Sequence, residues 1–289
     1  MHVSVLRSEV LEGLAIKSDG IYIDATAGLG GHSRDIAERL ETGKLYSADR
    51  DAESLEMARE NCGEVIERVE FIHSAFSGLK DALKVRNVPP AQGFLADLGV
   101  SRMQLTTPDR GFSFMADGPL DMRMDRSQGP TAADIANFTS EKELADLIYE
   151  YGEERRSRRI ARAITGARPI RTTRHLADVV ESAAPRMGKI HPATQTFQAL
   201  RMRVNGELDE IEALLDSLLS MVAVGGRVAL ISFHSLEDRI LKRRFQLWGR
   251  EHKVKILTKH VTKPSEDEVA GNPASRSAKL RLLEVGSWS

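Results

Sequence analysis

The sequence contains a single cysteine, Cys62, which lies in a polar, helix-like segment. One thiol forms no internal disulfide and cannot build a thiolate zinc site, so we expect Cys62 to be inert. Long apolar runs are also missing, since no stretch approaches the roughly twenty apolar residues that span a bilayer. The N-terminal stretch MHVSVLRSEV lacks the apolar core of a signal peptide. These absences predict a cytoplasmic protein with no membrane partner.

Charge is balanced overall but unevenly distributed. The formal net charge of -1 excludes a uniformly basic protein. Between Arg155 and Arg174, however, the chain has eight arginines and no acid. Solvated helix faces usually mix both signs, because like charges three or four residues apart repel each other. The run favours a phosphate-rich partner over an ordinary solvated face.

The stretch IYIDATAGLGGHSR, from Ile21 to Arg34, predicts a strand, a glycine turn and a helix. An apolar run ends at Asp24, and three glycines precede the helical pattern that starts at His32. Glycine allows a positive φ and a close approach of the backbone to a ligand, while the first N–H groups of a helix can bind polar groups. A tight turn without a ligand is the alternative.

The next apolar segment, residues 44–48, ends at Asp49. Dinucleotide-binding folds place a ribose-binding acid about twenty residues beyond the first glycine, as Asp49 is here. Asp24 precedes the glycines, which gives D-x-x-x-G-x-G rather than G-x-G-x-x-G and suits a ligand ammonium better than a pyrophosphate. This order resembles the first motif of S-adenosylmethionine-dependent methyltransferases and disfavours a nicotinamide-dependent oxidoreductase.

Two further strands are predicted at residues 69–73 and 93–98. Phe76 follows the first of them, at the edge where ligands bind in open parallel sheets, so it can stack on an adenine. A core phenylalanine under the loop is an equally good interpretation. Asp97 lies near the end of the second strand, and Gln104 follows as a candidate amide contact.

Asp24, Asp49 and Asp97 therefore all end strands of one predicted sheet. Three acids at one sheet edge indicate an electropositive or hydrogen-donating ligand.

The next strand, residues 227–233, lies about 130 residues further on. A parallel crossover needs only about a dozen residues, so this gap predicts an inserted domain. The insertion is helical in pattern, with predicted helices at 141–151, 153–165 and 173–184 and another after Pro192. A returning helix at 207–222 is expected to end at Gly225 and Gly226, and strands at 254–261 and 279–285 complete a doubly wound α/β sheet.

Local motifs along almost the whole chain resemble the bacterial small-subunit ribosomal RNA cytosine-N4 methyltransferases. They are DATAGLGGHS from Asp24, ADRD from Ala48, ADLGVS from Ala96, RGFSFMADGPLDMRMD from Arg110, YGEER from Tyr151, HPATQTFQALRMRVN from His191, ISFHSLEDR from Ile231 and SRSAKLR from Ser275. The resemblance implies a Rossmann-like class I methyltransferase domain at 1–105 and 206–289, with an inserted substrate-recognition domain at 106–205. It also implies S-adenosyl-L-methionine as cofactor and a cytidine of ribosomal RNA, free or in the assembled small subunit, as methyl acceptor.

The resemblance assigns residues to the cofactor site: Gly30, Gly31 and His32 in the turn, Asp49 at the ribose, Phe76 at the adenine, and Asp97 and Gln104 nearby. The chain departs from the family after Asp97. The family usually continues with serine, serine and proline, whereas here Arg102 and Met103 follow Ser101. A non-catalytic RNA-binding ribosome-assembly factor that keeps the cofactor fold is therefore the alternative function.

The exocyclic amine of cytosine is a poor nucleophile, so an acceptor must orient it and take its proton. Asp97 is the predicted catalytic residue for this task. The sulfonium donor is already reactive, so neither a metal nor a covalent nucleophile is expected. His234, after the strand at 227–233, is a second candidate for substrate contact, with a structural histidine as the alternative.

Asp117, Asp121 and Asp125 lack the spacing of an EF-hand, so we expect them to serve loop structure rather than a metal.

Overall fold

The computed structural model describes residues 4–186 and 191–287. The chain divides into two compact units, Met1–Gly99 with Leu208–Ser289 and Val100–Glu207, which we name the sheet unit and the helical unit. The first boundary precedes the predicted limit at residue 105 because Val100 packs against the core of the helical unit.

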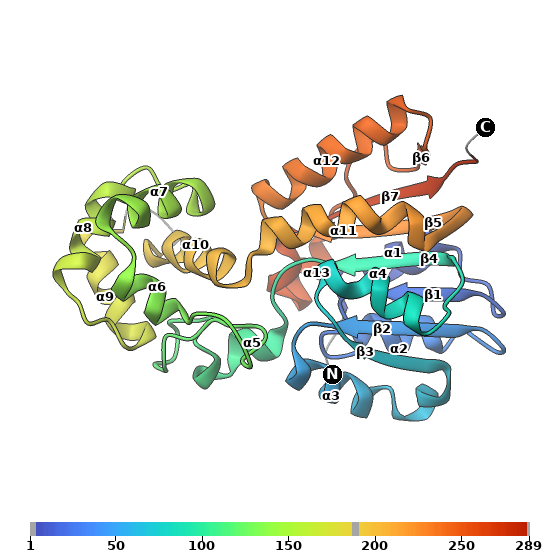
Figure 1. Cartoon of the computed structure of the whole chain (residues 1–289), viewed down its shortest axis with the longest axis horizontal. Helices are drawn as coiled ribbons and strands as arrows, with labels where there is room; N and C mark the ends of the chain where they lie inside the picture. The colour runs from blue at the N-terminus through green and yellow to red at the C-terminus, as the bar shows by residue number, and fades with distance from the viewer. Residues whose placement is uncertain (1–3, 187–190, 288–289) are drawn as a thin grey trace. The chain divides into compact units, whose positions relative to one another are not determined.

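The sheet unit contains one seven-stranded sheet in the order β3-β2-β1-β4-β5-β7-β6 (Figure 1). Strands β1 to β5 are parallel, whereas β7 runs antiparallel to both β5 and β6. This order confirms the predicted doubly wound α/β fold with a terminal strand pair. The strands are β1 (Ile21–Asp24), β2 (Lys44–Asp49), β3 (Val69–His73), β4 (Ala91–Asp97), β5 (Val222–Ser232), β6 (Val254–Ile256) and β7 (Lys279–Val285).

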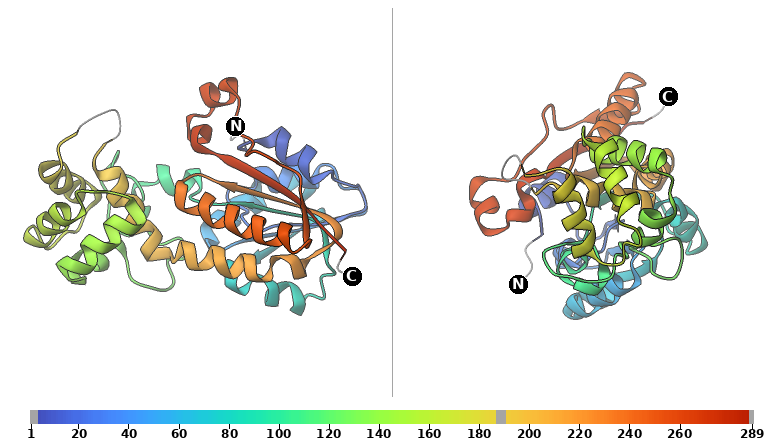
Figure 2. Two further views of the ribbon diagram at one scale, coloured as in Figure 1. Left: turned by 90° about the horizontal axis from the view of Figure 1, so that it is seen from above. Right: turned by 90° about the vertical axis from the view of Figure 1, so that its left-hand side faces the viewer.

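Helices cover both faces of this sheet (Figure 2). One face packs on α1 (Arg7–Leu14), α2 (Gly31–Ala37) and α3 (Ala52–Asn61), and the other on α4 (Phe76–Val85), α11 (Glu207–Met221) and α12 (Ser235–Arg250). The unit also contains α13 (Glu266–Gly271) and the 3-10 turns η1 (Gly63–Arg68) and η3 (Pro273–Ser277).

Successive residues of the central strands bury their side chains on opposite faces of the sheet. In β4, Phe94 and Ala96 belong to the core beneath α4, α11 and α12, whereas Leu95 belongs to the core beneath α1 to α3. Because both faces are covered, these strands are apolar at nearly every position, which is why their sequences read as short continuous apolar runs.

Two boundaries in the sheet unit differ from the prediction by several residues. Strand β5 begins at Val222, so Gly225 and Gly226 lie inside the strand rather than ending the helix before it. At Gly226 a Cβ atom would lie 2.9 Å from the carbonyl oxygen of Ala91, so glycine permits the close approach of β4. Strand β6 ends at Ile256, earlier than the predicted residue 261.

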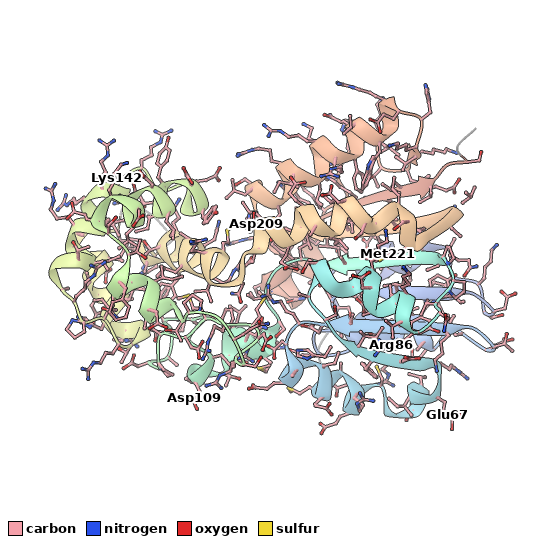
Figure 3. The ribbon with its side chains drawn as sticks, viewed as in Figure 1. Glu67, Arg86, Asp109, Lys142, Asp209 and Met221 are labelled. Carbon is pink, nitrogen blue, oxygen red and sulfur yellow. The ribbon has the colours of Figure 1, made fainter. Side chains whose placement is uncertain are left out.

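The helical unit contains α5 (Arg102–Thr106), η2 (Pro108–Arg110), α6 (Ala132–Phe138), α7 (Glu141–Gly152), α8 (Ser157–Gly166), α9 (Thr173–Ala183) and α10 (Ala193–Asn205). Its core includes Leu144 and Ile148 of α7, while the charged Lys142 of the same helix is exposed (Figure 3). Helix α8 begins later than the predicted residue 153, because Glu153 takes a left-handed conformation, φ 53°, and ends α7.

Candidate functional site

Asp24 connects the end of β1 to the start of α2 through hydrogen bonds. Its side chain is fully buried, and the Ser33 hydroxyl donates a 2.6 Å hydrogen bond to Oδ2. The backbone N–H and the hydroxyl of Thr26 donate to Oδ1 at 3.1 and 3.3 Å. Both oxygens of Asp24 thus accept hydrogen bonds from the turn and from α2, and its position near a ligand ammonium stays a prediction.

The glycine turn connects β1 to α2 and also reaches β2. Gly28 has φ 51°, and its N–H donates a 2.8 Å hydrogen bond to Oδ2 of Asp49. Gly30 has φ 82° and caps α2, which begins at Gly31. A Cβ atom on Gly30 would lie 2.9 Å from both the Cα and the carbonyl oxygen of Ala58 in α3. The backbone of this turn thus packs directly on α3, in a conformation that favours glycine.

Asp49 ends β2 and is half-buried. Besides Gly28, the N–H of Asp51 donates to its carboxylate at 2.9 Å. Burial raises the pKa of Asp49 to about 6, although these two N–H groups oppose the shift. Asp49 therefore lies beside the glycine turn, as the sequence predicted for a ribose-binding acid.

Asp97 ends β4, the neighbour of β1 on the side away from β2. Its N–H donates a 2.7 Å hydrogen bond to the Thr26 hydroxyl, and its Oδ2 lies 4.0 Å from Nε2 of buried His32. Oδ1 is buried and has no hydrogen-bond partner among the described residues.

Burial holds the pKa of Asp97 well above its usual range, and the nearby carboxylates of Asp24 and Glu237 add to the shift. A desolvated carboxyl with an unused oxygen thus lies where the order of the sheet reverses, the place at which such folds bind ligands.

The remaining two predicted cofactor contacts have structural roles of their own. Phe76 opens α4 and is half-buried against the core of the sheet unit, so both interpretations of this ring stay open. Gln104 is buried in the helical unit and forms a capping box with Ser101, whose N–H donates to Oε1 of Gln104 at 2.9 Å. Its contact with a cofactor stays a prediction.

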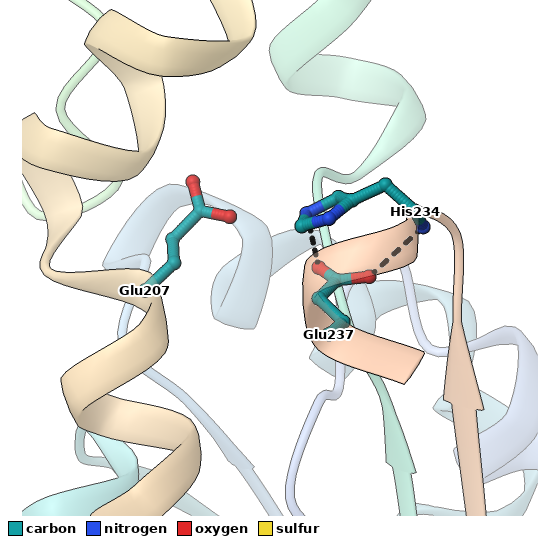
Figure 4. A group of neighbouring side chains, drawn as sticks. All are labelled: Glu207, His234 and Glu237. Atoms are coloured by element: carbon teal, nitrogen blue, oxygen red, sulfur yellow. Dashed lines mark hydrogen bonds and ion pairs between the residues drawn. The ribbon is translucent and has the colours of Figure 1, made fainter. Parts of the chain in front are cut away.

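His234 follows β5 and caps α12, where Glu237 fixes its position (Figure 4). Nε2 of His234 lies 3.0 Å from Oε1 of Glu237, while the N–H groups of Phe233 and His234 donate to Oε2 at 2.8 and 3.3 Å. Sequence reasoning missed Glu237, which is only 1% exposed. Its position three residues after the cap residue His234 was the available signal.

Asp117, Asp121 and Asp125 each accept hydrogen bonds or pair with an arginine, Asp117 with the start of α9 and the other two within their loop. Asp121 pairs with Arg123 at 2.8 Å, and Asp117 accepts a 3.0 Å hydrogen bond from the N–H of Arg174. Asp125 accepts hydrogen bonds from the N–H and hydroxyl of Ser127. These contacts support the interpretation that the aspartates order the loop.

The arginine run contains two kinds of residue. Arg156 pairs at 3.1 Å with buried Glu154, and Arg168 donates to the carbonyl oxygens of Ala136 and Thr139, so both hold the fold. The other six are exposed: Arg155, Arg158, Arg159, Arg162, Arg171 and Arg174. Because Arg162 also pairs with Glu141 at 3.5 Å, the predicted phosphate-binding run is reduced to the other five residues.

The order of the sheet, the glycine turn after β1, the acid after β2 and the unpaired buried oxygen after β4 define a Rossmann-like class I S-adenosylmethionine-dependent methyltransferase. A family model described as the MraW methylase family matches residues 1–285, and the chain belongs to this family.

Two curated relatives carry the name "Ribosomal RNA small subunit methyltransferase H". The protein of Solibacter usitatus is 58% identical over 285 residues, covering 99% of this chain and 100% of the relative. That of Koribacter versatilis is 51% identical over 292 residues, covering 97% and 92%. A solved structure, a putative rRNA-methylase from Clostridium thermocellum, aligns over 99% of both chains with 10% identity and a TM-score of 0.49.

No helix in the described part of the chain is both long enough and apolar enough to cross a bilayer.

Proposed function

We propose that this protein transfers the methyl group of S-adenosyl-L-methionine to the exocyclic N4 amine of a cytidine in small-subunit ribosomal RNA, in the cytoplasm. The observation that carries the proposal is the Asp97 carboxyl: it is desolvated, has an unused Oδ1 oxygen and lies beside His32 and the glycine turn. The name of the two curated relatives, with coverage of nearly the whole chain, supports the acceptor.

The cofactor suits the residues that surround the turn. Gly30 and Gly31 bring backbone close to the ligand, Asp49 offers carboxylate oxygens to ribose hydroxyls, and Phe76 offers an aromatic face to the adenine. When bound, S-adenosylmethionine supplies an electrophilic methyl group on a sulfonium, so the protein's task is to position the amine.

Asp97 performs that task in the proposed mechanism. The lone pair of the cytosine amine is delocalised into the ring, and a carboxylate that accepts a hydrogen bond from the amine aligns it for attack. As the amine nitrogen gains the methyl carbon, the sulfonium's carbon–sulfur bond would break and leave a neutral thioether; the amine becomes acidic and its proton passes to Asp97. The raised pKa of Asp97 suits this step, because it makes the carboxylate a better proton acceptor.

The exposed arginines of α8 are the proposed contacts to RNA phosphates. Ile160 and Ile164 bury the opposite face of α8, so Arg158 and Arg159 project into solvent, and Arg155, which precedes the helix, is exposed as well. Phosphate contacts of this kind position an RNA, whereas the base itself is read in the active site.

Transfer of a labelled methyl group from S-adenosylmethionine to unmodified small ribosomal subunits, followed by nucleoside analysis, tests the function. Labelled N4-methylcytidine is the expected product. Parallel reactions with the free RNA identify which form of the substrate is used. Cofactor binding without transfer to either substrate would contradict the proposal and favour the assembly-factor alternative.

A further inference from the structure

Helix α12 presents a cationic face that the proposed mechanism does not use. Its exposed residues are Ser235, Arg239, Lys242, Arg243, Gln246, Leu247 and Arg250, and none of them is acidic. At 3.6 residues per turn, Arg239, Lys242, Arg243 and Arg250 fall on one stripe about 17 Å long. We name these four residues the α12 stripe.

The opposite face of α12 packs into the protein core. Leu241, Phe245 and Trp248 are buried there, and the rings of Phe245 and Trp248 lie 6.0 Å apart. A basic helix that binds a membrane surface needs an apolar face to insert into the lipid. Because α12 has already buried its apolar face, the stripe offers only cationic groups.

Acids near α12 already have other partners. Arg244, on the flank of the stripe, pairs with Glu212 at 2.6 Å and with Asp216 at 2.5 Å. Asp238 pairs with Lys279 and Arg281 of β7. Within residues 4–186 and 191–287, Lys242, Arg243 and Arg250 have no acidic partner. A purely structural solvated face would normally interleave acids with such cations.

The excess of positive charge continues beyond the helix. From Arg239 to Lys263 the sequence has nine lysines and arginines and one acid, Glu251. That acid pairs with Lys253 at 2.9 Å. Lys255 and Lys259 extend the cationic surface past the end of α12, and both are exposed.

We propose that the α12 stripe binds the phosphate backbone of the RNA substrate, as a second cationic surface carried by the sheet unit. The inference rests on the proposed ribosomal RNA substrate and adds to it a surface separate from the arginines of α8. Lys242, Arg243 and Arg250, which have no acidic partner in the described part of the chain, complement a polyanion along one helix face, and their contribution is sequence-independent and sensitive to salt.

The test uses the full chain with the substitutions Lys242→Gln and Arg243→Gln combined. Lys80→Gln with Lys84→Gln is the matched control, since it removes the same charge from exposed positions of α4. Binding of RNA extracted from unmodified small subunits is measured between about 50 and 200 mM salt. Methyl transfer to intact subunits is measured in parallel.

Losing two phosphate contacts should reduce the slope of log affinity against log salt by about 1.4, at roughly 0.7 per contact for single-stranded RNA. KM for subunits should rise several-fold, while kcat and cofactor affinity stay at wild-type values. An unchanged slope, or an equal change in the α4 control, would overturn the inference.

Two further outcomes distinguish this inference from the proposed function and from membrane binding by the stripe. The wild-type protein could transfer no methyl group while the α12 variant still shows a smaller slope of log RNA affinity against log salt. That result would contradict the proposed function but support the RNA-binding role of the stripe. If the variant keeps the wild-type RNA slope but loses binding to vesicles of phosphatidylserine and phosphatidylcholine, the stripe is a membrane contact and the inference is wrong.

Discussion

At the scale of single residues, the proposed mechanism depends most on Asp97. The change Asp97→Asn keeps the shape of the side chain but removes its capacity to take a proton. We expect kcat to fall by about 10²- to 10⁴-fold, the usual contribution of a general base. Single-turnover methyl transfer and equilibrium binding of S-adenosylmethionine measure the two effects separately. Asp81→Asn, at an exposed position of α4, is the control.

The role of Asp97 would be refuted by wild-type turnover in the asparagine variant. A loss of cofactor affinity with unchanged kcat at saturation would instead make Asp97 a cofactor contact alone.

Asp49 predicts a pH dependence of cofactor binding. Its pKa of about 6 means that the carboxylate is mostly ionised at pH 7 and mostly protonated at pH 5. Only the ionised form offers all its oxygen lone pairs to ribose hydroxyls, so affinity should fall as the pH drops through about 6. Calorimetric titrations between pH 5 and 7.5 measure this, and Asp49→Asn should abolish the step. If cofactor affinity still falls near pH 6 in this variant, another group is responsible for the pH dependence.

Asp49 also affects stability, with the opposite dependence on pH. Its folded pKa lies above the ordinary aspartate value near 3.9, so ionisation opposes folding. The stabilising contribution is complete below the unfolded pKa and is lost as the pH rises through about 6. Bound cofactor offsets this loss, because it favours the ionised carboxylate.

At the scale of elements, the glycine turn is the most constrained segment of the site. Gly30→Ala places a methyl group 2.9 Å from the backbone of Ala58 at a φ of 82°, so α3 or the turn must move. We expect a loss of about 2 kcal/mol or more in unfolding free energy, together with weakened cofactor binding. Denaturant unfolding measures the first effect. Gly63→Ala, which meets no atom within 4 Å, should be nearly neutral.

A Gly30→Ala variant with wild-type stability would mean that the packing of the turn on α3 is looser than this geometry implies.

Experiment can separate the arginines of α8, which are proposed to bind RNA, from Arg156, which precedes the helix and has a structural role. Arg158→Gln with Arg159→Gln should weaken RNA binding and lower its salt dependence by about 1.4 in slope, without loss of stability. Arg156→Ala should instead destabilise the helical unit by about 3 kcal/mol, since it leaves buried Glu154 without its cation. RNA titrations and thermal unfolding of each variant distinguish the groups. Equal effects of the two changes on RNA binding would contradict the division.

The strands and long helices could be predicted because buried strands read as apolar runs and helices repeat every 3.6 residues. Contacts between distant residues could not. Nothing local to Asp24 reveals that Ser33 lies 2.6 Å from its carboxylate, nor does the glycine pair at 225–226 reveal the neighbouring backbone of Ala91. The arginine run showed charge but not which guanidinium is held by Glu154.

At the scale of the whole molecule, the sequence showed the insertion because a gap of about 130 residues is far too long for one crossover. It also brought Asp49 and Asp97 to one edge, since the carboxyl ends of parallel strands meet there. The structural role of Gln104 could not be predicted in this way. Its hydrogen bonds cap α5 in the helical unit, and the position of α5 depends on where the chain leaves the sheet.

The division into two compact units predicts that cofactor binding protects them unequally. A ligand bound to the sheet unit at 100 times its Kd stabilises that unit by about 2.7 kcal/mol. Hydrogen exchange in S-adenosylmethionine should therefore slow for amides of β1 and β4, whereas amides of α7 and α10 should exchange at the rate of the free protein. Equal slowing in all four elements would mean that the units open as one cooperative body, so that the helical insertion is coupled energetically to the cofactor site.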